Sequence, residues 1–193
     1  MHGCRSGGWC SVRRCGGMTM YDRVADLLIR EAAPIFAIMD GARDRAIPRA
    51  LHGSGFRHQS LYDGRAAEEL GSFGPYLIEL GGDAQAIEDW VRTGWGKSFG
   101  VYLACDQPFD VVRRHLRRFT LVELKNGRKA YFRFYDPRVL RLFLPHCTYE
   151  EWIQFFGPIG TFFAESEDAK SLLRFFRDAE EPEPTCLALE SGS

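Results

Sequence analysis

Three aspartates, Asp40, Asp63 and Asp136, each follow a predicted strand at a turn of the chain. Ligands of α/β folds bind where strands end, so these carboxylates, with the nearby Arg133, could hold a small molecule or transfer protons. An aspartate at such a turn, however, caps a helix more often than it catalyses. No nucleophile, base or metal cluster can be placed beside the three carboxylates. The sequence therefore assigns no catalytic residue, and an enzyme or small-molecule binder is the alternative hypothesis.

Other segments that resemble reactive motifs fail on spacing or context. Gly96-Lys97-Ser98 looks like the end of a phosphate-binding loop, but that pattern requires glycine where Val91 stands. The segment also follows a predicted helix instead of opening one. Cys147 is adjacent to His146, and neighbouring side chains rarely converge as a nucleophile and base must. The histidines lack any metal-ligand spacing, so we expect neither a metal nor a cofactor.

The stretch 131–145, YFRFYDPRVLRLFLP, joins a predicted strand to a predicted helix. Asp136 suits the N-cap, and Pro137 suits the first helical position because its missing N–H has no intrahelical partner there. Arg133 alternates with aromatic residues, and an arginine in a buried strand requires a carboxylate or carbonyl partner. We expect Asp136 to cap the helix, Arg133 to pair inside the sheet and Arg138 to face a partner.

Apolar periodicity and turn residues predict one α/β domain over residues 21–178. Strands alternate with helices as far as Cys105, and Asn126-Gly127 then predicts a β-hairpin that is followed by C-terminal helices. We expect a mixed sheet flanked by helices, with parallel pairs where helices cross over. The expected strands cover residues 35–39, 58–62, 76–80, 98–105, 121–124, 129–135 and 161–164, and the expected helices or helical turns cover 21–31, 47–51, 65–70, 84–93, 109–119, 137–144, 149–156 and 170–177.

The two ends of the chain differ from this domain in composition. Residues 1–20 are rich in glycine, cysteine and arginine, and their apolar residues follow neither the helical nor the strand spacing. This composition predicts a disordered leader. Their cysteines lack the short spacing of a zinc knuckle. Residues 179–193 contain two prolines and several glutamates, and we expect a flexible acidic tail.

The overall charge and hydropathy narrow the class of partner. The formal net charge is −1 at pH 7, which argues against nucleic acid as a partner. Arg113, Arg114, Arg117 and Arg118 nevertheless form a basic strip on a predicted helix, and this strip is either a solvated face or a contact for an acidic partner. No apolar run approaches the ~20 residues that span a bilayer. We expect a cytoplasmic protein without membrane insertion.

Six segments together resemble, in order and spacing, the effector-adaptor (chaperone) domain of bacterial type VI secretion systems, the Tap/TEC-type family. The resemblance covers roughly Ile35 to Ala164. The segments are FAIMDGARD at 36–44, LYDG at 61–64, PYLIEL at 75–80, GWGKSFGVYL at 94–103, RRHLRRF at 113–119 and FRFYDPRVLRLFLP at 132–145.

The resemblance implies a non-enzymatic adaptor that stays in the cytoplasm. Such a protein binds the N-terminal region of a toxin effector and loads it onto the spike-tip protein of the secretion system. The toxin segment would lie in an apolar groove or add as a strand to a sheet edge. Tyr62 and Trp95 are the expected aromatic anchors. The expected partner-binding residues are Arg133, Asp136, Arg138, Tyr62, Trp95, Asp40 and Arg43.

Overall fold

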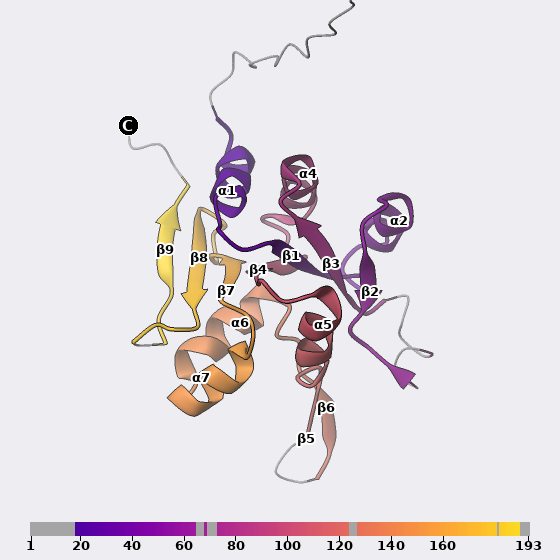
Figure 1. Cartoon of the computed structure of the whole chain (residues 1–193), viewed down its shortest axis with the longest axis vertical. Helices are drawn as coiled ribbons and strands as arrows, with labels where there is room; N and C mark the ends of the chain where they lie inside the picture. Colours follow the sequence, from indigo (N-terminus) through magenta and orange to yellow (C-terminus); the bar gives the residue numbers. More distant parts are fainter. Residues whose placement is uncertain (1–17, 65–67, 69–72, 124–126, 181, 190–193) are drawn as a thin grey trace, which may run out of the picture.

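A seven-stranded antiparallel sheet organises the molecule (Figure 1). The computed structural model describes residues 18–64, 68, 73–123, 127–180 and 182–189, and the expected leader and the expected helix at 65–70 lie almost entirely outside them. Along the sheet the strands are β2 (His58–Ser60), β3 (Pro75–Gly81), β1 (Ile35–Asp40), β4 (Gly100–Ala104), β7 (Thr161–Glu165), β8 (Ser171–Phe176) and β9 (Thr185–Ala188).

The single α/β domain is confirmed, whereas the expected parallel pairs do not occur between the described strands. Each pairing in the sheet is antiparallel. β3 and β4 both pair with β1, so they run in the same direction with β1 between them. Helix α4 (Ala84–Gly94) therefore crosses over from β3 to a strand of the same direction two positions away. A helix crossover allows the two strands that it joins to run in the same direction, but it does not make those strands neighbours.

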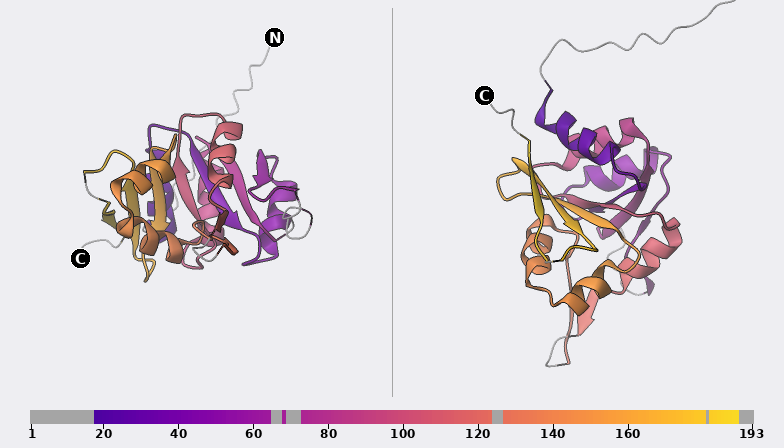
Figure 2. Two further views of the ribbon diagram at one scale, coloured as in Figure 1. Left: turned by 90° about the horizontal axis from the view of Figure 1, so that it is seen from below. Right: turned by 60° about the vertical axis from the view of Figure 1, so that its left-hand side comes forward.

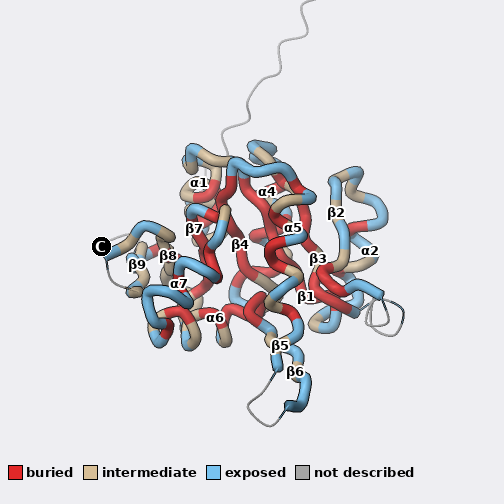
Figure 3. The backbone as a smooth tube through the Cα atoms, turned by 60° about the horizontal axis from the view of Figure 1, so that its bottom comes forward, coloured by how far each residue is buried: buried red, intermediate tan, exposed pale blue. Residues whose placement is uncertain are grey.

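Helices cover both faces of the sheet, and the central strands are apolar on both sides for that reason. In β1, Phe36 and Ile38 pack on the side of α5 (Phe109–Arg117), α6 (Pro137–Phe143) and α7 (Tyr149–Phe156). Ala37 and Met39 pack on the side of α1 (Met20–Ile29), α2 (Ala46–Gly53) and α4. Figure 3 shows these central strands as the most buried part of the backbone. The sequence predicted this double coverage of β1 correctly.

A β-hairpin projects from the side of the sheet that α5–α7 cover (Figure 1). Its strands are β5 (Leu121–Glu123) and β6 (Lys129–Tyr131), which pair in antiparallel register as expected. The strand prediction was too long, because β6 ends at Tyr131 and not at Tyr135. Phe134 and Tyr135 turn into the core, where they are almost fully buried, and the chain then enters α6.

The C-terminal region differs most from expectation. Residues 170–177 were predicted as helical turns, but Ser171–Phe176 form β8 between β7 and β9. The tail was expected to be flexible, yet Thr185–Ala188 form β9, and Leu189 is buried behind it. These strands form the end of the sheet nearest the C-terminus (Figure 2). Pairing between neighbouring strands therefore overrides the local composition of this segment.

Candidate functional site

Five charged residues at the turn from β6 into α6 form one cluster, which we call the elbow cluster. It consists of Asp40, Arg43, Arg133, Asp136 and Arg138. Asp40 is the last residue of β1, and Arg43 lies in the turn that follows. The backbone N–H of Arg43 donates to the Asp40 carbonyl at 3.0 Å. The other three residues come from the segment between the hairpin and the first turn of α6. Residues about 90 positions apart in the sequence are thereby joined by ion pairs.

Asp40 is buried and anchors the first half of the cluster. Its Oδ1 accepts a hydrogen bond from the backbone N–H of Ala42 at 3.0 Å, and Arg133 donates to Oδ2. The Arg133 side chain remains 45% exposed. The expectation that Arg133 pairs with a carboxylate is correct. The expectation that this pair lies inside the sheet is wrong, because Arg133 follows the end of β6 and lies outside the sheet. The carboxylate faces inward and the guanidinium faces outward.

Asp136 anchors the second half and caps α6 as the sequence predicted. Its Oδ1 accepts from the backbone N–H of Arg138 at 3.0 Å and from Nε of the same residue at 2.9 Å. Its Oδ2 accepts from Nη2 of Arg138 at 2.6 Å and from Nη2 of Arg43 at 3.1 Å. Burial raises the pKa of Asp136, and the positive charge of Arg43 opposes that increase. Arg138 is 51% exposed, so one buried carboxylate fixes an arginine that solvent and a partner can reach.

Three tyrosines, two of them buried, connect the cluster to the hairpin. The hydroxyl groups of Tyr62 and Tyr135 are 3.2 Å apart, and burial raises the pKa of both. The ring of Tyr131 lies 5.3 Å from that of Tyr62 and is 46% exposed. Leu121 pairs with Tyr131 across the hairpin and is 43% exposed. Tyr62 was expected to be an aromatic anchor for a partner, but it is buried, and the exposed ring is that of Tyr131.

Trp95 is not available as an anchor either, because it is buried in the core. Its Nε1 donates to the carbonyl of Ala169 at 2.9 Å. The loop that follows is held by Glu165, whose carboxylate accepts from the backbone N–H of Gly96 at 2.6 Å and that of Ser98 at 2.9 Å. The backbone donors that would hold a phosphate in a true phosphate-binding loop are therefore occupied by a buried side chain. The sequence did not indicate Glu165, because its partners lie almost 70 residues away.

The three aspartates considered as acid–base groups do not all converge. Asp40 and Asp136 belong to one cluster, whereas Asp63 is 59% exposed and pairs with Arg117 on α5. Both cluster carboxylates accept hydrogen bonds from backbone amides and from guanidinium groups. Asp40 lies at the end of β1, Asp136 caps the start of α6, and both orient arginines. Among the residues that the structure describes, His, Cys, Asp and Glu side chains do not form a group of three that could hold a metal ion.

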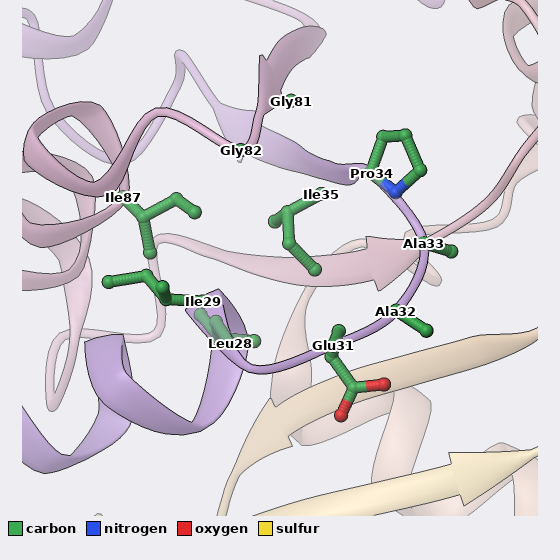
Figure 4. A pocket seen from close by; sticks show the side chains of 10 residues that line it. All are labelled: Leu28, Ile29, Glu31, Ala32, Ala33, Pro34, Ile35, Gly81, Gly82 and Ile87. Atoms are coloured by element: carbon green, nitrogen blue, oxygen red, sulfur yellow. The ribbon is translucent and has the colours of Figure 1, made fainter.

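Two cavities on the opposite face of the sheet lie apart from the elbow cluster. One, of about 180 Å³, lies between the end of α1 and the start of α4 (Figure 4). Leu28, Ile35 and Ile87 face it, while the carboxylate of Glu31 points away and pairs with Arg174 of β8 at 2.7 Å. The other, of about 290 Å³, lies between α2 and α4. Neither includes a residue of the cluster.

The fold and the cluster together define a single-domain α/β protein whose candidate site is an exposed set of arginines held by buried carboxylates. Residues 35–154 match the model of a family described as a domain of unknown function, DUF4123, and the chain belongs to that family. No curated protein and no solved structure was found to match the chain. Within the described residues, no helix has the length and apolar character to cross a bilayer.

Proposed function

We propose that this chain is a type VI secretion effector adaptor. In this proposal it binds the N-terminal region of a toxin effector in the cytoplasm, without catalysis, and loads the toxin onto the spike-tip protein. The single observation that carries the proposal is the outward presentation of Arg133 and Arg138 by two buried aspartates, beside an exposed tyrosine. The resemblance of six segments to the adaptor family, spread over residues 36–145, supports it.

The elbow cluster has the properties of a binding surface for a peptide segment. Arginine and tyrosine are enriched among the residues that dominate protein interfaces. Asp40 and Asp136 fix the guanidinium groups before a partner arrives, so less side-chain freedom is lost on binding than with free arginines. The guanidinium donors that remain exposed suit the carboxylates and carbonyls of a partner chain.

Tyr131 and Leu121 supply the apolar part of the same surface. They lie opposite each other on the hairpin, and contacts through the buried Tyr62 and Tyr135 connect the ring of Tyr131 to the cluster. Arg133 lies over the ring of Tyr135, with its Cζ 5.9 Å from the ring centroid. We propose that the toxin segment runs from the hairpin across the cluster to the first turn of α6. An aromatic anchor with adjacent charged donors is a common arrangement at protein interfaces.

Co-purification with the proteins encoded beside this chain tests the proposal. We expect tagged full-length chain, co-expressed with the neighbouring toxin and spike-tip protein, to retain the toxin through affinity and size-exclusion chromatography. The toxin without its N-terminal region is the control, and it should not be retained. If neither neighbouring protein co-purifies with the chain, the proposed function is wrong.

A further inference from the structure

Helix α5 and its C-cap residue together carry four arginines, and among the described residues a carboxylate pairs with only part of this basic strip. Nε of Arg113 donates to the carbonyl of Ser60 at 2.9 Å, and Arg117 pairs with Asp63. Arg114 and Arg118 lie one turn apart, and no carboxylate pairs with either among the residues that the structure describes. Two like charges at this spacing repel each other on a helix surface.

Arg118 is fixed in position although it lacks a carboxylate partner. Its Nη2 lies 2.6 Å from Nδ1 of His115, and because arginine has no acceptor, Nδ1 must accept. Nε2 of His115 then donates to the carbonyl of Phe155 at 2.7 Å. Burial lowers the pKa of His115, in agreement with the neutral ring that this arrangement requires. Gly157 packs on the ring so closely that a Cβ there would lie 2.2 Å from Cε1 of His115.

A cavity of about 330 Å³ opens beside these two arginines. Its lining combines Arg114 and Arg118 with the ring of His115 and the apolar side chains of Val111 and Pro158. The C-terminal end of a helix favours cations, which explains why basic residues are stable here. The helix end does not account for the contact by which the buried His115 fixes Arg118 beside the cavity. Nor does it account for the lack of an acidic residue among those that line the cavity. A carboxylate entering the cavity would pair with both guanidinium groups.

We propose that this cavity binds an acidic side chain of a protein partner. The partner is identified by charge complementarity, because the lining offers two guanidinium groups, a neutral ring and apolar surface but no carboxylate. This site is separate from the elbow cluster and does not depend on the function proposed for that cluster. It assigns a role to the basic strip on α5, which the elbow cluster does not use.

A nuclear magnetic resonance titration of the full chain tests the proposal. The probe is the peptide acetyl-Gly-Glu-Glu-Gly-amide, with acetyl-Gly-Gln-Gln-Gly-amide and inorganic phosphate as separate arms. We expect the acidic peptide to cause saturable shifts of the Nε–Hε signals of Arg114 and Arg118, which weaken as salt is added. Arg114→Gln is the first variant, because Arg114 is exposed and no hydrogen bond or ion pair within the described residues involves its side chain. We expect at least a tenfold loss of affinity, since one of the two guanidinium donors is removed.

The matched control is the Arg45→Gln/Arg49→Gln double variant, which removes two exposed arginines, the N-cap residue of α2 and one within that helix, on the other face of the sheet. It should bind the acidic peptide as the native chain does, whereas Arg114→Gln/Arg118→Gln should not bind it. The proposal is overturned if the acidic peptide causes no shift at Arg114 and Arg118, or if the glutamine peptide binds equally well. Saturable binding of phosphate without binding of the acidic peptide would also overturn it, because the cavity would then be a site for small anions.

Discussion

An Asp136→Ala variant is expected to have a free energy of unfolding about 3 kcal/mol lower than that of the native chain, because two stabilising roles of Asp136 are lost together. The first is the N-cap of α6, where Oδ1 accepts from the backbone N–H of Arg138. The second is the buried anion that Arg43 and Arg138 share. Both arginines are partly exposed and can be hydrated in the variant, which keeps the loss below the sum of the two effects. Urea denaturation at neutral pH measures it.

Asp63→Ala is the control for this prediction, since it also removes an aspartate from an ion pair with an arginine. Asp63 is 59% exposed, and a surface ion pair contributes about 0–1 kcal/mol. An Asp136→Asn variant should fall between the two, because the amide oxygen still caps the helix while the charge is gone. Equal losses of stability for Asp136→Ala and Asp63→Ala would show that burial of Asp136 does not stabilise the elbow cluster.

Replacing Tyr131 by alanine and Arg138 by glutamine together is expected to weaken toxin binding about a hundredfold, or about 2.7 kcal/mol. The double variant removes the exposed ring of the hairpin and one of the two outward-facing guanidinium groups. Stability should change little, because both side chains are about half exposed and Arg43 still pairs with Asp136. Isothermal titration calorimetry with the purified N-terminal region of the toxin gives the affinity, and urea denaturation gives the stability.

The matched control for the binding prediction is Tyr149→Ala/Arg49→Gln, which makes the same chemical changes away from the elbow cluster. Tyr149 is 69% exposed on α7, and Arg49 is exposed on α2. This variant should bind the toxin segment with native affinity. Equal weakening by both double variants would mean that binding depends on general surface properties and not on the elbow cluster.

The sequence predicted most of the described elements as far as β7 well, because each has a strong local signal. Asp136-Pro137 predicted the start of α6, and the apolar run at β1 predicted a strand covered on both faces. The segment that became β8 has adjacent apolar pairs, Leu172-Leu173 and Phe175-Phe176, and these fit a helix as well as a strand covered on both faces. Its state is decided by pairing with β7 and β9, which local periodicity does not contain.

The sequence indicated the residues of the elbow cluster but not how these residues are arranged in space. Aspartates at strand ends and arginines near them indicated the cluster, but the sequence could not say which member of each pair is buried. The two expected aromatic anchors, Tyr62 and Trp95, lie inside the fold, while Tyr131 is partly exposed. Exposure of an aromatic residue depends on what packs over it. Neither Glu165 nor the cavity beside Arg114 and Arg118 could be inferred, since each is built from segments that are distant in the sequence.

Export of the neighbouring toxin by living cells tests the central claim most directly. The strain should lack the gene for this chain, and the toxin in the culture medium should be measured beside a tube protein of the same secretion system. The proposed function predicts that the toxin disappears from the medium while the tube protein is still exported. The native chain should restore export, and the Tyr131→Ala/Arg138→Gln variant should not. Export of the toxin at the native level without this chain would contradict the account.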